Sequence, residues 1–181
     1  MTELNIVPEC YVDTRIAEIL GEAKREYNHQ HGSSNVANKM IKDLKERIAL
    51  GIIDEDKHKG PSGDYFLEFD TMVEKNNLIL KKHPNRKHYL VLVCPEAEKW
   101  LFNDAKKVGI NPTDKEYNLP EEMKGFIKIS KIKRIKKNDG FHRFIKALIR
   151  AEAPSLTTLK EWITLFKSNQ LYTLSNKQQD D

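Results

Sequence analysis

The fold class follows from residues 89–101, which have the sequence YLVLVCPEAEKWL. The first six of these residues are almost entirely apolar, and they favour a buried strand from Tyr89 to Cys94. The acidic residues after Pro95 lead into a helix that carries Trp100 and Leu101. A buried strand that passes directly into an amphipathic helix is typical of a parallel sheet covered by helices.

Apolar runs of the same kind occur twice nearer the N-terminus. Residues 4–7 (LNIV) and 49–53 (ALGII) each predict a short buried strand, and a helical pattern follows the first of them. Asp13 or Thr14 is the expected N-cap of that helix. A second helix is expected over residues 36–47. Because strands alternate with amphipathic helices, we predict an α/β fold with a mostly parallel sheet flanked by helices.

Weaker signals cover the rest of the chain. Residues 66–76 predict a helix or an irregular segment, and residues 78–80 predict a short strand. Two later helices have clear apolar faces, one over residues 140–151 and one over residues 155–167 that Ser155 is expected to cap.

A change in composition after residue 107 predicts the domain organisation. We expect an α/β core over residues 1–107. Residues 108–174 are expected to form a basic segment and two helices that pack on this core. The polar residues 175–181 predict a disordered tail.

The composition of the 181-residue chain excludes several classes of protein. Hydrophobic residues make up 39% and charged residues 32%, which fits a modest core with a heavily charged surface. The longest apolar runs are too short to cross a bilayer, and the first residues lack the regions of a signal peptide. Two cysteines are too few to form the disulfide framework that stabilises a small secreted protein. We therefore expect a cytoplasmic protein with no membrane partner.

Positive charge is concentrated in the C-terminal part. The formal net charge is +4, yet residues 124–150 contain ten Lys and Arg residues against the single acid Asp139. Within them, residues 128–137 alternate bases with isoleucine, which favours a strand with one basic face or a basic amphipathic segment. Such a face would bind the phosphate backbone of DNA or RNA, although a solvated surface has the same pattern. The candidate nucleic-acid-binding residues are Lys128, Lys131, Lys133, Arg134, Lys136, Lys137 and Arg143.

Acidic residues follow each of the three predicted buried strands. They are Glu9, Asp54, Asp56, Glu96 and Glu98. Because the carboxyl ends of parallel strands lie at one edge of a sheet, these carboxylates are expected to converge if the strands are neighbours. Like charges about 4 Å apart repel by roughly 1–4 kcal/mol, and Mg²⁺ or Mn²⁺ bound through oxygen would offset that repulsion. Alternatively, each acid stabilises the start of the helix that follows it.

The order of these motifs resembles the Toprim family. Glu9 follows the first strand, Asp13 lies close behind it, and Asp54-Glu55-Asp56 follows a later strand. Small bacterial Toprim-like proteins, including RloB-like ones, are related to the Toprim domain of the overcoming-lysogenization-defect nucleases. They are similar in two further places, at residues 95–101 (PEAEKWL) and 140–148 (GFHRFIKAL). The resemblance covers roughly residues 4–150.

This resemblance implies a Toprim- or Rossmann-like fold and Mg²⁺-dependent cleavage of nucleic acid phosphodiester bonds, in a phage-defence context. It implies that Glu9 is a general acid or base, that Asp54 and Asp56 hold Mg²⁺, and that Glu96 or Glu98 is a further ligand. Toprim domains usually have glycine directly after the first glutamate, where this chain has Cys10. The alternative is therefore a non-catalytic module with a degenerate site, which binds nucleic acid or a partner ATPase.

Other classes of function fit the residues less well. Zinc could be bound by His29, His31, His58, Cys10 and Cys94, but no Cys-x-x-Cys or His-Glu-x-x-His pattern connects them. The cysteines are instead expected to pack as small apolar residues. A receiver-like phosphorylation domain would need adjacent acids after the first strand, and an ATPase or dinucleotide enzyme would need a glycine-rich phosphate loop.

Overall fold

The computed structural model describes residues 3–55 and 63–178. The strands are β1 (Ile6–Pro8), β2 (Ala49–Asp54), β3 (Asp70–Lys75), β4 (Leu78–Lys82) and β5 (His88–Val93). The α-helices are α1 (Tyr11–Leu20), α2 (Ser33–Lys42), α3 (Gly63–Leu67), α4 (Ala97–Lys107), α5 (Met123–Ser130), α6 (Asp139–Arg150) and α7 (Pro154–Lys167). The 3₁₀ helices are η1 (Glu3–Asn5), η3 (Lys133–Lys137) and η4 (Leu171–Gln178).

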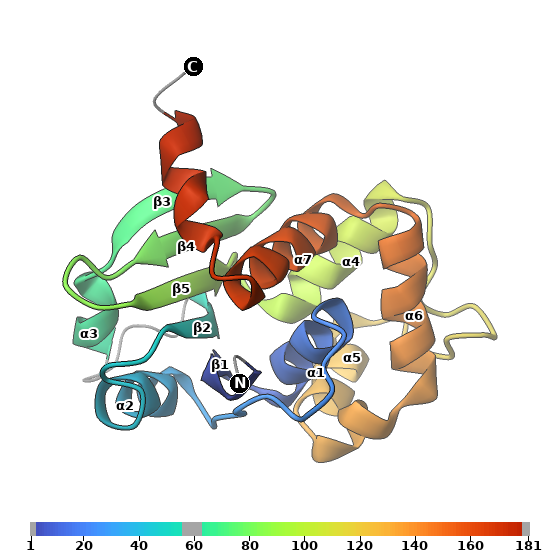
Figure 1. The fold of residues 1–181 in the computed structure, drawn as a ribbon. Helices are drawn as coiled ribbons and strands as arrows, with labels where there is room; N and C mark the ends of the chain where they lie inside the picture. Colours follow the sequence, from blue (N-terminus) through green and yellow to red (C-terminus); the bar gives the residue numbers. More distant parts are fainter. Residues whose placement is uncertain (1–2, 56–62, 179–181) are drawn as a thin grey trace.

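The strands form one open sheet with the order β1-β2-β5-β4-β3 (Figure 1). The first three strands of this order are parallel, as the sequence predicts, whereas β4 and β3 continue the sheet antiparallel to β5. Asn76 and Asn77 both have positive φ and join β3 to β4 in a two-residue hairpin. The α/β class is therefore confirmed, but the sheet is mixed rather than mostly parallel.

Strand β3 replaces the helix or irregular segment predicted over residues 66–76. It lies at the edge of the sheet, and four of its six side chains are exposed. An edge strand of this kind carries charged residues on its open side, so its sequence lacks the apolar run of a central strand. The residues before it form the short helix α3.

Helices cover both faces of the sheet. In β5, Val91 and Val93 pack into a large core with α1, α4, α6 and α7, whereas Leu90 and Leu92 pack against α2 and α3. Successive side chains of a strand point to opposite faces, so a strand buried on both faces is apolar throughout. Because the large core includes side chains from α6 and α7, the C-terminal helices pack on the same face of the sheet as α1 (Figure 1).

The basic stretch 128–137 is not a strand. Its first residues end α5 and its last five form η3. Ile135 is fully buried, but Ile132 is 46% exposed, so the isoleucines do not share one apolar face. The strand prediction is therefore wrong, because the alternation of bases and isoleucines does not correspond to an alternation of burial.

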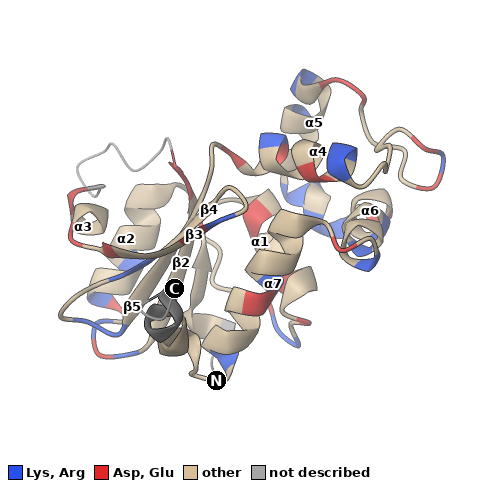
Figure 2. Ribbon diagram, turned by 90° about the horizontal axis from the view of Figure 1, so that it is seen from above, with Lys and Arg blue, Asp and Glu red and all other residues tan. Residues whose placement is uncertain are grey.

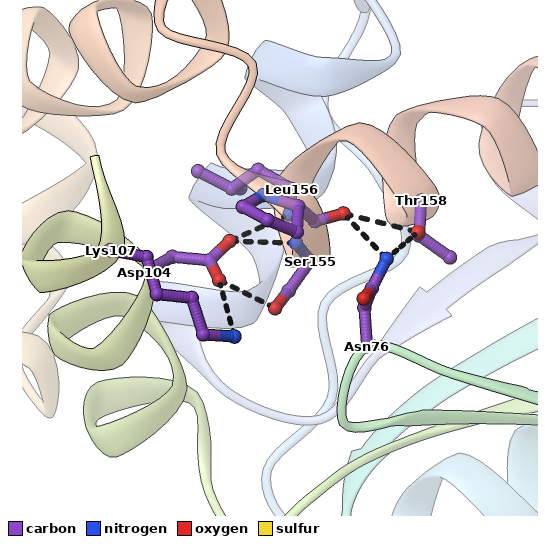
Figure 3. Close-up of polar contacts among 7 residues, drawn as sticks. Asn76, Asp104, Lys107, Ser155, Leu156 and Thr158 are labelled. Atoms are coloured by element: carbon purple, nitrogen blue, oxygen red, sulfur yellow. Dashed lines mark hydrogen bonds and ion pairs between the residues drawn. The ribbon is translucent and has the colours of Figure 1, made fainter.

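The expected start of the last helix is also corrected. The N-cap of α7 is Ala153, with no capping side-chain hydrogen bond, and Pro154 is the first helical residue. Ser155 lies one residue further on and donates from its backbone and its hydroxyl to Asp104 of α4 (Figure 3). In the chain's tail, η4 extends to Gln178.

No helix among the described residues is both long enough and apolar enough to span a membrane.

Candidate functional site

The carboxyl edge of the three parallel strands brings together acidic side chains that are distant in sequence. Glu9 directly follows β1, Asp54 is the last residue of β2, and Glu98 lies in the first turn of α4, shortly after β5. All three are buried, with exposures of 2%, 2% and 6%. The adjacent, parallel pairing of β1, β2 and β5 places these positions at one edge.

Hydrogen bonds connect the three strand ends. The backbone N–H of Asp54 donates to Oε2 of Glu9 at 3.1 Å, and the backbone N–H of Glu9 donates to the carbonyl of Ile52 at 2.9 Å. Oδ1 of Asp54 in turn accepts from the backbone N–H of Ala97, the first residue of α4, at 3.1 Å. The predicted proximity of Glu9 and Asp54 is thus confirmed, and Asp54 also anchors the helix that carries Glu98.

Asp13 is a fourth buried carboxyl group in this cluster, with an exposure of 3%. Burial raises the pKa of Asp13 well above its usual range, and the charges of Asp54, Glu9 and Glu98 raise it further. Sequence reasoning treated Asp13 only as a helix cap and part of a family motif. The available signal was its position in the first turn of the helix that directly follows Glu9. We name Glu9, Asp13, Asp54 and Glu98 the carboxylate cluster.

Cys10 is the N-cap of α1, in place of the expected Asp13 or Thr14. Its sulfur accepts from the backbone N–H of Asp13 at 3.5 Å, and its thiol donates to Oδ2 of Asp13 at 2.9 Å. Burial raises the pKa of the Cys10 thiol well above its usual value, and the charge of Asp13 adds to this effect. The thiol is therefore protonated at neutral pH and orients Asp13 rather than acting as a nucleophile. Both cysteines pack at the margins of the apolar cores, as expected.

The other predicted metal ligands are placed differently. Glu96 is the N-cap residue of α4 and forms an ion pair with Lys99 at 2.9 Å, with 23% of its side chain exposed. Glu98, by contrast, accepts a short hydrogen bond from the hydroxyl of Ser130, at the end of α5. Asp56 lies outside the described residues, as do His58 and Gly60.

The chemistry of the carboxylate cluster suits a hard divalent cation. Within residues 3–55 and 63–178, no three His, Cys, Asp or Glu side chains have an arrangement that holds a metal ion by itself. Mg²⁺, however, is commonly bound through one or two carboxylates, with waters and substrate phosphate oxygens as its other ligands. Asp54 and Glu9, which are linked through one hydrogen bond, could provide those carboxylates.

His29 lies beside the cluster because residues 28–32 run along the outer edge of β1. The backbone N–H groups of Asn28 and Gln30 donate to the carbonyls of Ile6 and Pro8. The ring of His29 stacks on Tyr11 with a centroid distance of 4.3 Å. Sequence reasoning expected only a polar loop here, since no pattern predicts this edge contact.

The hydroxyl of Thr14 sets the tautomer of His29. Thr14 donates to the carbonyl of Cys10 at 2.7 Å, so its oxygen must accept from Nδ1–H of His29 at 2.9 Å. Burial, followed by the charge of His31, lowers the pKa of His29, which is therefore neutral at pH 7. Nε2 then carries a lone pair, and this buried atom has no hydrogen-bond partner among the described residues. His29 thus places a nitrogen that can accept a proton close to Tyr11 and Thr14 in the first turn of α1.

The predicted nucleic-acid-binding residues divide into two groups. Lys136 is half-buried and forms ion pairs with Glu18 at 3.4 Å and Glu26 at 3.1 Å, so its charge is already compensated. The exposed members are Lys128, Lys131, Lys133, Arg134, Lys137 and Arg143. Basic residues along α5 and α6 are visible in Figure 2. Arg143 donates from Nε to the carbonyl of Glu116 at 2.7 Å.

Asp13→Asn is expected to stabilise the metal-free protein increasingly as the pH rises. Because the pKa of Asp13 is raised in the folded state, the folded protein keeps a proton that the unfolded chain loses near pH 4. The corresponding stabilisation is complete below that pH and is lost as the pH rises through the folded-state pKa. Asparagine does not titrate, so the melting temperature of the variant should exceed that of the wild type most at about pH 8 and least near pH 5.

The measurement is a series of thermal melts in EDTA. Asp43→Asn is the control, since Asp43 is exposed and paired with Lys39 on the surface. It should show no gain with pH. A difference between Asp13→Asn and wild type that stays constant from about pH 5 to 8 would contradict a protonated Asp13.

Comparison of the chain with known protein families, curated proteins and solved structures gave no match. The resemblance to Toprim domains therefore stays a prediction.

Proposed function

We propose that this protein is a Toprim-like, Mg²⁺-dependent enzyme that cleaves phosphodiester bonds in nucleic acid, in a phage-defence context. The observation that carries the proposal is the hydrogen bond between Asp54 and Glu9 inside a buried carboxylate cluster at the carboxyl edge of parallel strands. Ligands of open α/β sheets bind at this edge. Burial and the charges of Asp54, Glu9 and Glu98 raise the pKa of Asp13, and a pKa perturbed in this way is typical of a functional site.

Each member of the site has a distinct role in this proposal. Glu9, oriented by the backbone N–H of Asp54, moves a proton at the reacting oxygen as general acid or base. Asp54 would hold the metal together with Asp56, which lies outside the described residues, and Glu98, fixed by Ser130, would be a further ligand. Mg²⁺ or Mn²⁺, when bound, would polarise a phosphoryl oxygen and offset the charge that develops on it. Asp13 loses its proton more readily when a cation compensates the neighbouring charges.

A second candidate is a non-catalytic module that binds nucleic acid or a partner ATPase. It is favoured by the exposed bases between Lys128 and Lys137 and by Cys10 in the place where Toprim domains usually have glycine. Such a module would bind a phosphate backbone with strong salt dependence and would not need a metal.

A cleavage assay distinguishes the two candidates. Purified protein is incubated with supercoiled plasmid, single-stranded DNA and RNA, each with Mg²⁺, Mn²⁺ or EDTA. The enzyme is expected to cut at least one substrate with either metal and none in EDTA. Binding without cleavage under all metal conditions would support the non-catalytic module instead.

A further inference from the structure

A basic pocket of about 500 Å³ lies beside α1, outside the carboxylate cluster. It is lined by the second half of α1, the loop that follows this helix, η3 and the first half of α6. The residues that matter for its chemistry are Arg15, Lys133, Lys136, Lys137, His142 and Lys146. These come from segments more than 100 residues apart in the sequence, so the pocket is a product of the fold and not of one charged run.

The charges around the pocket do not balance. Seven Lys and Arg residues line it, against the three glutamates Glu18, Glu22 and Glu26. Lys136 already forms ion pairs with Glu18 and Glu26, and Arg15 lies 4.0 Å from Glu18. Lys133, Lys137 and Lys146, in contrast, have no ion pair within 4 Å among the described residues. The pocket therefore retains an excess of positive charge after its internal pairs are counted.

Arg15 and His142 both line this pocket and contact each other. An Nη atom of Arg15 lies 3.0 Å from Nδ1 of His142. Because a guanidinium group can only donate, Nδ1 is the acceptor of this hydrogen bond. Neutral His142 therefore carries its proton on Nε2. Burial, Arg15 and Lys146 lower the pKa of His142, which keeps the ring neutral. Nε of Arg15 is buried and has no hydrogen-bond partner among the described residues. A buried donor without a partner is costly, and an anion's oxygen is the kind of acceptor that satisfies it.

We propose that this pocket binds a phosphate group of a nucleic acid strand whose neighbouring region lies over the carboxylate cluster. Asp13 of the carboxylate cluster lies in the first turn of α1, and the pocket is lined by Arg15, Glu18 and Ile19 further along the same helix, so one strand that follows α1 can reach both. A phosphate with several charged oxygens matches a site with an arginine, a histidine N–H and three lysines that have no ion pair within the described part of the chain. The location beside the cluster rests on the proposed function, but phosphate binding itself does not require cleavage.

The test measures binding in EDTA, where no metal-dependent cleavage occurs. Fluorescence anisotropy is recorded with a labelled single strand of about 12 nucleotides, a length within the usual site size of single-strand binding proteins. The pocket variant carries Lys133→Gln, Lys137→Gln and Lys146→Gln. The control variant carries Lys45→Gln, Lys75→Gln and Lys106→Gln, which removes the same charge from exposed positions outside the pocket. Because these positions carry surface charges, both variants are expected to fold, and thermal melts verify this.

The pocket variant is expected to raise Kd about tenfold or more, and to reduce the slope of log K against log salt by roughly one, the change for loss of a single phosphate contact. The control variant should change Kd by less than about threefold. Inorganic phosphate at constant ionic strength should displace the strand from wild type. Tighter binding of a 5′-phosphorylated strand than of a 5′-hydroxyl strand assigns the pocket to a terminal phosphate, and equal binding assigns it to the backbone.

Two results would overturn the proposal. One is an equal or larger loss of binding in the control variant, which would describe a diffuse basic surface. The other is the absence of strand binding by wild type at about 50 mM salt, where nucleic acid affinity is high. If the pocket variant loses binding as expected but the wild type never cleaves, the proposed function fails while the phosphate site stands.

Discussion

Asp54→Asn is expected to reduce metal-dependent cleavage about a hundredfold or more, because weakening a metal ligand itself should cost more than the roughly 10–100-fold lost when a ligand's hydrogen-bonding partner is removed. The substitution removes the negative charge that would attract the cation. It keeps the side chain's size, and its amide oxygen can still accept from the backbone N–H of Ala97. The backbone N–H of Asp54, which orients Glu9, is unaffected. The variant should therefore lose cleavage activity but keep its fold.

Glu96→Gln is the matched control for this prediction. Glu96 is also an acid at the carboxyl edge, but it pairs with Lys99 and is partly exposed. Its replacement should change the cleavage rate by less than about threefold, since an exposed ion pair contributes little. Single-turnover rates and melting temperatures are measured for all three proteins. An Asp54→Asn protein that cleaves as fast as wild type would remove Asp54 from the mechanism.

The central strands could be predicted from sequence because burial on both faces leaves an unbroken apolar run. This holds for β2 and β5, whose observed bounds lie within one residue of the expected ones. The edge strand β3 was missed because its exposed side removes that signal. The basic stretch after α5 was misread for a different reason. The segment η3 packs on α1 and α5, Ile135 is buried there while Ile132 stays exposed, and no local pattern encodes those contacts.

The candidate site was predictable to a similar degree. Glu9 and Asp54 could be found because the end of a parallel strand has a known position in the sheet. Asp13 lies near them because of the way α1 is oriented on the sheet. Glu98 differs from Glu96 in its hydrogen bond with Ser130, which is 32 residues further along the chain. Lys136 seemed a free base, but it is neutralised by Glu18 and Glu26 of another segment. Tertiary contacts of this kind depend on the whole fold.

The largest expected loss of stability comes from Asp104, which holds α7 against α4 (Figure 3). Asp104 is fully buried and accepts from the backbone N–H groups of Ser155 and Leu156 at 2.8 and 3.1 Å. It also accepts from the Ser155 hydroxyl at 2.7 Å. These donors are at the first turn of α7, where N–H groups have no partner within the helix, and Ala153 supplies no capping side chain. Asp104 therefore caps the N-terminus of α7 from the neighbouring helix α4.

Asp104→Ala is expected to lower the free energy of unfolding by about 3–5 kcal/mol, because it leaves several buried donors without a partner. Asp104→Asn keeps one acceptor oxygen and should cost less. Ser155→Ala removes only the hydroxyl and should cost about 1 kcal/mol. Urea denaturation of the three variants measures this order. An Asp104→Ala protein no less stable than Ser155→Ala would mean that water satisfies these N–H groups. The junction between α4 and α7 would then be held by its apolar contacts alone.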